Sequence, residues 1–380
     1  MLGPSRLRGS GANRSSVAGD LAIAAVPWVA SRALVLAALA VSRRVVDNVG
    51  AHPRPIALHQ GLLAWDGAFY GDIARGGYGS VGRDGLRFFP LLPLAGRAVG
   101  LLPWVDARGG VVVVANLSAL VAAVLLVRLV DFETGDRGLA TRSATILLVA
   151  PHAFVFVMGY AESLLCALAL AMFLGLRKER WWLAVLAGFA AGLCRPVGIL
   201  LALPALVEAI RVTRRDHRRR IAPLVATIAP IAGMASYLLW ARDRTNDLWL
   251  VLRLQNDVKL RGGTVSPFTS VGHAFHELFS GDRVGYGLHA VTAVVVVVLV
   301  VVVGRRLPFS YTVYAAAAVL VALCARNLDS VERYSLSTFP LVVGAGVLLA
   351  RPAFERFVYL LIAGGLAAAA VLAFTGTLVP

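Results

Sequence analysis

The chain has 380 residues, of which 58% are hydrophobic and 15% are charged, and its mean hydropathy is +0.76. A soluble domain of this length needs far more polar surface to cover itself, so the composition excludes one. The formal net charge of +16 does not indicate a nucleic acid partner, because the basic residues cluster in short turns between apolar runs, as in membrane proteins.

The N-terminal part divides into a short tail and a first membrane span. Residues 1–19 are rich in Gly, Ser and Arg, and we expect them to be a disordered segment in the cytoplasm. Residues 20–380 are expected to form one transmembrane domain, whose first span covers about 20–41. Residues 88–103 are apolar but short and broken by prolines, which is typical of an interfacial or re-entrant segment. Residues 42–109 together therefore form the first outer loop.

Ten further apolar runs approach the length of a bilayer-spanning helix, which takes about 20 residues. They lie at 110–130, 143–158, 163–176, 181–194, 197–210, 221–241, 288–304, 309–325, 335–350 and 357–376. A polar stretch at 242–287 interrupts the series and is expected to be a second large outer loop. The sequence thus predicts an all-α polytopic membrane protein with about 10–12 transmembrane helices.

The positions of the basic turns predict the orientation of the chain. With the N-terminus in the cytoplasm, all the strongly basic turns fall on the cytoplasmic side, as the positive-inside rule requires. These turns are 128–142, 177–180, 211–220, 305–306 and 351–356. The outer side receives the two large loops and three short ones at 159–162, 195–196 and 326–334. The abundance of Ala, Val, Arg and Gly favours the inner (plasma) membrane of a bacterium.

Ionisable residues next to the membrane segments gather on the outer side of this topology. They are Asp66, Asp72, Glu162, Arg195, Glu332 and Arg333. Charged groups at or within membrane boundaries are costly and therefore indicate function. Their common location predicts an active site at the outer surface of the membrane, open laterally to lipid.

The stretch 64–74 carries the strongest candidate for a catalytic group. Asp66 is placed to deprotonate an acceptor hydroxyl, although an Asp here also suits the N-cap of a helix. Asp72 lies six residues further on, so the two acids do not share a helical face. Trp65 and Tyr70 suit an interfacial helix, and we assign them with Asp72 to substrate binding.

Three arginines are candidates for holding a phosphate group, because a guanidinium binds phosphate bidentately. They are Arg87, Arg195 and Arg333; the alternative for Arg195 is snorkelling to the interface. The segment after Arg87 is apolar and kinked. Its residues Phe88, Phe89 and Pro90 are expected to form a groove for a prenyl or acyl chain, with simple burial as the alternative.

The remaining candidates are polar residues of the short outer loops. Glu162 is expected to orient a sugar hydroxyl or a cation, or else to stabilise the N-terminus of a helix. Glu332 and Tyr334 flank Arg333 and are assigned to substrate binding, although a Glu-Arg neighbour pair can be a weak surface ion pair.

No cofactor is assigned. His273 and His276 are spaced to share a helix face, which leaves a divalent metal as an alternative that nothing else in the sequence indicates. Glycine-rich phosphate loops are absent, which argues against a nucleotide-driven enzyme.

Several of these motifs, taken in order, resemble the signature of PIG-V-like mannosyltransferases, which are membrane glycosyltransferases of the GT-C superfamily. The matching segments are residues 65–70 (WDGAFY), 73–74, 77–78, 88–94 (FFPLLPL), 160–164 (YAESL), 181–184 (WWLA), 195–198 (RPVG), 333–334 and 339–340. The resemblance covers roughly residues 60–340. The spaced set is much more specific than any single motif.

The resemblance implies a GT-C-like helical bundle and an inverting transfer of a sugar, with mannose favoured, from a polyprenyl-phosphate donor. The acceptor would be a lipid, a glycan or a protein, and no nucleotide site is needed. Asp66 would be the base, and Glu162 and Arg195 match further family positions. Asp72 and Ala68 depart from the family pattern, which puts the identity of the acceptor in doubt.

Two alternatives to an enzyme remain open at this point. A lipid-phosphate flippase or solute transporter would use the same outer acids and arginines for binding alone. Such a protein is expected to place polar groups near the middle of the membrane, and these segments contain few. A non-catalytic subunit of an envelope glycosylation complex would retain the motifs without activity.

Overall fold

The computed structural model describes residues 16–49, 53–216, 218, 220–257, 263–280, 284–326, 328 and 330–379. These residues are almost entirely helical, and the described part of the chain contains no strand, only an isolated bridge between Thr264 and Ala325. The predicted class, an all-α polytopic membrane protein, is confirmed.

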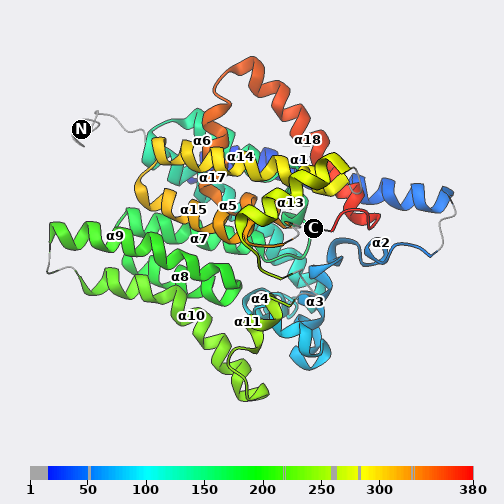
Figure 1. Ribbon diagram of the computed structural model, residues 1–380, viewed down its shortest axis with the longest axis horizontal. Helices are drawn as coiled ribbons and strands as arrows, with labels where there is room; N and C mark the ends of the chain where they lie inside the picture. Colours follow the sequence, from blue (N-terminus) through cyan, green and yellow to red (C-terminus); the bar gives the residue numbers. More distant parts are fainter. Residues whose placement is uncertain are drawn as a thin grey trace.

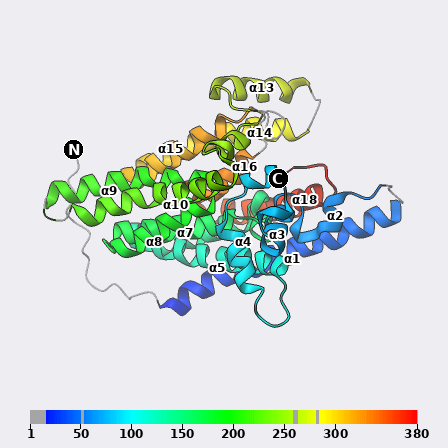
Figure 2. The same cartoon turned by 90° about the horizontal axis from the view of Figure 1, so that it is seen from below.

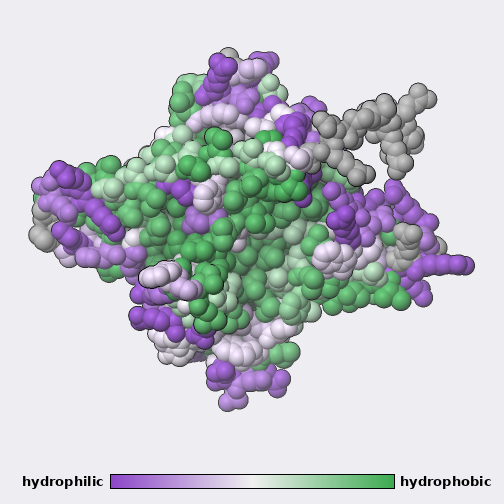
Figure 3. Space-filling view, turned by 180° about the vertical axis from the view of Figure 1, so that it is seen from behind, coloured by the Kyte–Doolittle hydropathy of each residue, from purple (hydrophilic) through white to green (hydrophobic). Residues whose placement is uncertain are grey.

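Among the described residues, six helical segments are long and apolar enough to cross a bilayer. They belong to α1 (Val17–Val49), α5 (Ala107–Thr134), η5 (Pro196–Leu201) with α9 (Ala202–Arg215), α10 (Ile221–Thr245), α14 (Val284–Arg306) and α18 (Pro352–Phe374). Shorter apolar helices pack beside them: α6 (Arg137–Val149), α7 (Glu162–Arg177), α8 (Trp181–Cys194), α15 (Phe309–Leu323) and α17 (Phe339–Leu348). Helices α1, α8, α9 and α14 run roughly along the long axis of the molecule, whereas α18 crosses it obliquely (Figure 1). A broad apolar region covers the middle of the face seen in Figure 3, and hydrophilic side chains gather at its edges.

Helix α1 is longer than the first predicted span at both ends. It begins at Val17, so residues 17–19 are helical and not disordered as predicted, and it continues to Val49. The rest of the predicted disordered tail, residues 1–15, lies outside the described residues. Asp20 explains the early start, because its buried carboxylate pairs with Arg128 at 2.8 Å and Arg137 at 2.7 Å. These contacts fix the first turn of α1 against α5 and α6.

Two predicted spans are broken by proline. The run 143–158 is α6 followed by the short 3₁₀ helix η4 (Pro151–Phe156), because the residue before a proline is driven out of the helical region. The run 335–350 is α16 (Val331–Ser337) followed by α17, with a non-helical Thr338 between them. The hydropathy of both runs is continuous, which is why the breaks were not predicted. Each break lies close to a segment that carries candidate site residues.

The second outer loop is more ordered than predicted. Within 242–287, α10 continues to Thr245 and two further helices follow, α11 (Leu250–Gln255) and α13 (Pro267–Ser280). Helix α13 lies along the outside of α14 and also contacts α15 (Figure 2). Its buried residue Ala274 belongs to the same apolar cluster as the core residues of α14 and α15. This hydrophobic face explains why the segment is a packed helix and not a loop.

The first outer loop consists of short helices, as predicted. They are α2 (Ile56–Gln60), η1 (Gly61–Leu63), α3 (Asp66–Gly76), η2 (Tyr78–Ser80), η3 (Arg83–Arg87) and α4 (Leu91–Val99). Helix α3 begins at Asp66 itself, so Asp66 is not the N-cap that was considered from the sequence. The N-cap is Trp65, whose φ of 59° lies in the left-handed region. A non-glycine residue in this conformation is strained, and such strain is concentrated at functional sites.

Helices α8 and α10 pack closely where each carries a glycine. A Cβ atom added to Gly192 would lie 2.1 Å from the carbonyl oxygen of Pro230, and one added to Gly233 would lie 2.0 Å from that of Phe189. Gly192→Ala and Gly233→Ala should each destabilise the protein by about 1–3 kcal/mol, because the backbones must separate. Thermal unfolding in detergent measures the effect. Gly364→Ala is the matched control in a membrane helix, since nothing lies within 4 Å of its added Cβ, and an equal loss there would contradict the explanation.

Candidate active site

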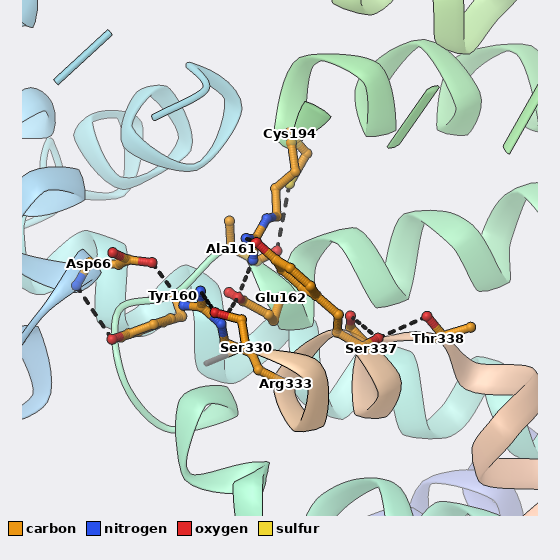
Figure 4. A network of polar contacts seen from close by, with 11 residues as sticks. Asp66, Tyr160, Ala161, Glu162, Cys194, Ser330, Arg333, Ser337 and Thr338 are labelled. Atoms are coloured by element: carbon orange, nitrogen blue, oxygen red, sulfur yellow. Dashed lines mark hydrogen bonds and ion pairs between the residues drawn. The ribbon is translucent and has the colours of Figure 1, made fainter. Parts of the chain in front are cut away.

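Four charged side chains from distant parts of the chain meet at one end of the bundle. Asp66 is the first residue of α3, Glu162 is the first residue of α7, and Arg333 lies in α16. Arg195 follows α8 and has an extended backbone, because Pro196 prevents the helix from continuing through it. Figure 4 shows Asp66, Glu162 and Arg333 pointing toward one another. The structure thus brings together the central members of the predicted set.

Ion pairs join the four residues into a chain of alternating charge. Nη1 of Arg333 lies 2.8 Å from Oδ2 of Asp66, and its Nε lies 3.0 Å from Oε1 of Glu162. Nη1 of Arg195 contacts the same oxygen of Glu162. Arg333, Glu162 and Arg195 are buried, whereas the side chain of Asp66 is 22% exposed. Asp66 is therefore the most exposed member of this network.

Arg333 is held rigidly at the centre of this network. Burial lowers the pKa of its guanidinium, but the carboxylates of Glu162 and Asp66 raise the pKa by more, so Arg333 remains charged. Its guanidinium lies over the rings of Tyr160 and Tyr334, at 5.4 Å and 5.5 Å from their centroids. A desolvated cation on an aromatic face is stabilised by about 2 kcal/mol. These contacts fix the cation that faces Asp66.

The carboxylate of Asp66 lines a cavity of about 680 Å³. Among the described residues of its wall, Asp66 is the one acid, and Arg87 and Arg333 are the basic residues. The remaining lining is mostly apolar and comes from three places: Pro55, Ile56, Ala57, Gln60, Trp65, Ala68 and Phe69; Ala325, Leu328, Ser330 and Tyr334; and Thr375, Gly376 and Val379. The cavity therefore combines a carboxylate, two cations and an apolar wall.

Arg87 is the second cation of the cavity. Its guanidinium lies over the rings of Phe69 and Phe88, at 5.6 Å and 4.9 Å from their centroids. Its Nε is buried and has no hydrogen-bond partner, and no carboxylate of the described residues pairs with it. The carbonyl oxygen of Arg87 accepts a 2.6 Å hydrogen bond from Gln255 of α11, which fixes the backbone. A fixed cation with an unpartnered donor is suited to an anionic ligand.

Of the six predicted substrate-binding residues, two lie in the cavity wall and four, among them Tyr70 and Asp72, do not. Trp65 and Tyr334 line it, and the indole nitrogen of Trp65 donates a 3.0 Å hydrogen bond to the carbonyl of Ala373. Tyr70 is buried behind the wall, edge-on to Phe88 at 5.1 Å. Asp72 lies on the opposite face of α3, as its spacing from Asp66 predicted, and faces Arg108 at 3.7 Å.

Glu332 is buried away from the cavity. Its Oε1 lies 2.7 Å from Nδ1 of His289 in α14. Burial alone would raise the pKa of Glu332, but the hydrogen bond with His289 and the neighbouring imidazoles lower it below the ordinary value. Glu332 therefore connects α16 to α14, next to Arg333, and does not reach the cavity.

The three residues predicted to form a lipid groove do not line one common groove in the structure. Phe88 is buried and stacks on Phe69 at 4.6 Å, so that Phe69 and not Phe88 faces the cavity. Phe89 is buried against Tyr237, with ring centroids 4.7 Å apart. Pro90 lines a second cavity, on the far side of this segment. The segment thus separates two cavities.

The structure adds residues that the sequence did not single out. The hydroxyl of Tyr160 accepts a 3.3 Å hydrogen bond from the N–H of Asp66, and the hydroxyl of Ser330 accepts one of 3.0 Å from Arg333. Tyr160 precedes Glu162 by two residues, so its position in the motif was a usable signal. The cavity residues after α18 carried no such signal, since Thr375 and Val379 lie in an ordinary apolar C-terminal segment.

Arg32 and Asn116 hold the backbone at the end of η4, just before Tyr160 and Glu162. Arg32 donates hydrogen bonds to the carbonyl of Phe156 at 2.8 Å and to Oδ1 of Asn116 at 2.9 Å. The amide of Asn116 donates to the carbonyl of Val157 at 2.8 Å. The carbonyls freed at the end of η4 are thus paired inside the membrane, where an unpaired group is costly.

Asn116→Ala should therefore weaken both the fold and the site. It leaves Nε of Arg32 and the carbonyl of Val157 without a partner, which costs about 1–3 kcal/mol. Thermal unfolding should report this loss, and a reduced turnover rate should follow from displacement of the segment before Glu162. Ser118→Ala is the matched control on α5, because Ser118 is buried and makes no hydrogen bond through its side chain. Equal behaviour of the two variants would contradict the positioning role.

No metal centre is evident in the part of the chain that the structure describes, where no three His, Cys, Asp or Glu residues are arranged to hold an ion. The closest histidine pairing from the sequence, His273 and His276 in α13, lies outside the cavity. Nε2 of His273 lies 3.9 Å from Oε1 of Glu277 on the same helix.

Among the comparisons with known proteins, one solved structure supports this architecture. The structure is similar to that of ArnT from Cupriavidus metallidurans bound to undecaprenyl phosphate, with a TM-score of 0.52 and 16% sequence identity over 95% of this chain and 76% of that one. It also matches the Archaeoglobus fulgidus oligosaccharyltransferase tethered with an acceptor peptide, with a TM-score of 0.42 and 11% identity over 91% of this chain and 55% of that one. A comparison with curated proteins gave no match.

The match to ArnT confirms the GT-C-like fold that the sequence motifs implied. The family comparison gives a glycosyltransferase and does not confirm the PIG-V-like family that the motifs resemble. The model of glycosyltransferase family 87 matches residues 88–328, which is more than half of the chain. The matched region includes Glu162 and Arg195, while Asp66 precedes it. The chain is a multi-pass membrane protein and belongs to glycosyltransferase family 87.

Proposed function

We propose that the protein is an inverting glycosyltransferase that moves a sugar from a polyprenyl-phosphate donor to a lipid, glycan or protein acceptor. Mannose is the favoured sugar. The observation that carries this proposal is the cavity where the Asp66 carboxylate opposes the cations Arg87 and Arg333. A carboxylate at this position accepts the proton of an acceptor hydroxyl. Two guanidiniums beside it hold the phosphate of the donor.

The charge of the site supports a phosphate-linked donor. Two carboxylates, Asp66 and Glu162, face three guanidiniums, those of Arg87, Arg195 and Arg333, which leaves one positive charge in excess. A sugar phosphodiester carries one negative charge and balances it. The apolar part of the wall suits a prenyl chain, and the ArnT structure named above contains undecaprenyl phosphate. A polyprenyl-phosphate sugar therefore fits the site without a nucleotide pocket.

The proposed reaction is a single displacement at the anomeric carbon. The acceptor oxygen forms a bond to this carbon while the bond to the phosphate oxygen of the donor breaks. The acceptor proton passes to the carboxylate of Asp66, and polyprenyl phosphate leaves with the bonding electron pair. Arg87 and Arg333 stabilise the negative charge that develops on the leaving phosphate. Attack opposite the leaving group inverts the configuration of the sugar.

The proposals for the transferred sugar and for the membrane in which the protein lies rest on the sequence. The resemblance to PIG-V-like mannosyltransferases supports mannose as the first sugar to test. The basic turns support an N-terminus in the cytoplasm and an active site on the outer face of a bacterial inner membrane. The single domain spanning residues 20–380 would contain the whole site, with residues 42–109 contributing the base.

The test is sugar transfer by the purified protein in lipid nanodiscs. Polyprenyl-phosphate mannose and polyprenyl-phosphate glucose are supplied with extracted envelope lipids and glycans, and products are identified by mass spectrometry and anomeric NMR. We expect a covalent product of inverted configuration from the mannosyl donor. Transfer from a nucleotide sugar instead, or movement of the donor across the bilayer without any covalent product, would overturn the proposal.

A further inference from the structure

A second cavity of about 520 Å³ lies on the other side of the segment that carries Arg87. Helices α3, α4, α8 and α10 and the turn η2 contribute its walls. Its polar and aromatic lining residues are Tyr78, Arg97, Ser236, Tyr237, Trp240 and Arg244. None of its lining residues belongs to the wall of the catalytic cavity, so the two are separate sites.

The charge of this cavity differs from that of the catalytic one. Its described lining contains Arg97 and Arg244 and no acid, and neither arginine pairs with a carboxylate of the described residues. Arg97 donates to the carbonyls of Ala74 at 2.7 Å from Nε and Ile73 at 3.3 Å from Nη2, and its Nη1 has no hydrogen-bond partner among the described residues. Arg244 stacks on Trp240, 4.4 Å from the ring centroid. Two uncompensated guanidiniums in one cavity favour an anion over a neutral sugar.

The exposed residues around α4 place this cavity at the level of lipid headgroups. Leu94 of α4 lines the cavity and is largely exposed. The turn that follows α4 exposes Leu101, Leu102 and Trp104, the last completely. Exposed aromatic and leucine side chains beside arginines are typical of the boundary between headgroups and acyl chains. The anion that reaches this cavity is therefore expected to belong to a membrane lipid.

Residues that line the second cavity also form hydrogen bonds to the backbone on either side of Arg87. The hydroxyl of Tyr237 donates a 2.7 Å hydrogen bond to the carbonyl of Leu86, and that of Tyr78 donates one of 2.7 Å to the carbonyl of Phe88. The rings of Tyr78 and Trp240 lie 4.8 Å apart. A ligand that packs against these rings is therefore in contact with residues that fix a cation of the catalytic cavity.

We propose that the second cavity is a binding site for the phosphate headgroup of an anionic membrane lipid, held by Arg97 and Arg244 at the outer ends of α4 and α10. The site is distinct from the one proposed for the donor phosphate, and its occupancy supports the position of Arg87.

The test is lipid binding by the full chain, measured by native mass spectrometry and thermal unfolding in detergent. Phosphatidylglycerol, phosphatidylcholine and soluble glycerol 3-phosphate are titrated against the wild type and the double variant Arg97→Gln/Arg244→Gln. We expect phosphatidylglycerol to bind the wild type in preference to phosphatidylcholine, and the double variant to bind it at least about tenfold more weakly. Binding of glycerol 3-phosphate as strong as that of the lipid would show a free phosphate ester as the ligand and overturn the lipid assignment.

Arg242→Gln is the matched control, because Arg242 lies on the same last turn of α10 as Arg244, is exposed and does not line the cavity. It removes the same charge and should leave phosphatidylglycerol binding unchanged. An equal loss in Arg242→Gln, or undiminished binding in the double variant, would overturn the proposed site. Asp66→Asn should retain the lipid preference, so this result is independent of whether the protein transfers a sugar.

Discussion

Asp66→Asn is expected to reduce sugar transfer by about 10²–10⁴-fold, the range for loss of a general base. The amide keeps the shape of the carboxylate but does not accept the proton of the acceptor hydroxyl. The fold should remain intact, because Arg333 keeps its ion pair with Glu162 at 3.0 Å and Asp66 is the most exposed member of the network. The loss should therefore appear in the rate constant for transfer and not in the amount of folded protein.

The measurement is the initial rate of transfer in nanodiscs, with the thermal unfolding temperature recorded in parallel. Asp72→Asn is the matched control: it makes the same change on the same helix, on the face that points toward Arg108. We expect it to retain most of the activity. Undiminished turnover in Asp66→Asn, or an equal loss in Asp72→Asn, would contradict the assignment of Asp66 as the base.

Glu162→Gln is expected to have the largest effect on stability. The carboxylate of Glu162 is fully buried and lies between Arg195 and Arg333. Without its charge, Arg195 is buried without an anionic partner, and Arg333 retains Asp66 alone. Removing one partner of a buried ion pair costs about 3–5 kcal/mol. Transfer should also fall, because Arg333 loses the contact that orients it toward Asp66.

Two comparisons separate the electrostatic explanation from a general loss of packing. The double variant Glu162→Gln/Arg195→Met removes the uncompensated charge and should recover part of the stability lost in Glu162→Gln. Glu208→Gln disrupts another buried ion pair, with Arg177 at 3.0 Å, far from the cavity. It should lower the unfolding temperature but leave transfer by the folded protein close to wild type. An unchanged unfolding temperature in Glu162→Gln would contradict the account.

The sequence predicted the members of the charged network better than their arrangement. Asp66, Glu162, Arg195 and Arg333 stood out because charges beside apolar segments are costly and seldom accidental. Their pairing was beyond prediction, since Arg333 and Asp66 are 267 residues apart. Which arginine reaches the base depends on the packing of α16 against α7 and η4, and no local pattern encodes that contact.

Packing between segments explains why some predicted residues lie outside the cavity. Asp66 and Phe69 line the cavity. Tyr70 follows Asp66 by four residues and lies on nearly the same face of α3, yet its side chain is buried against Phe88. The sequence predicted Tyr70, and not Phe69, as a substrate-binding residue. The orientation of Trp65, with its positive φ, also required the structure.

The spans were predicted well where apolar runs end at charged or proline residues, as α8 does before Arg195. They were predicted poorly where a run contains a break, as at Pro151, because hydropathy does not change there. Helix α13 was missed because it lies within a stretch rich in polar residues, although one face of the helix is apolar and packs on α14. Composition reports how apolar a segment is, whereas backbone hydrogen bonding and packing decide where a helix ends.

The most direct test of the central claim is photoaffinity labelling with a polyprenyl phosphate that carries a diazirine next to its phosphate, followed by mapping of the labelled peptides. If the Asp66 cavity binds the donor phosphate, label appears in residues 55–57, 65–69, 328–334 and 375–379, and Arg87→Gln reduces it. Labelling confined to peptides outside these segments, with no change in Arg87→Gln, would contradict the account.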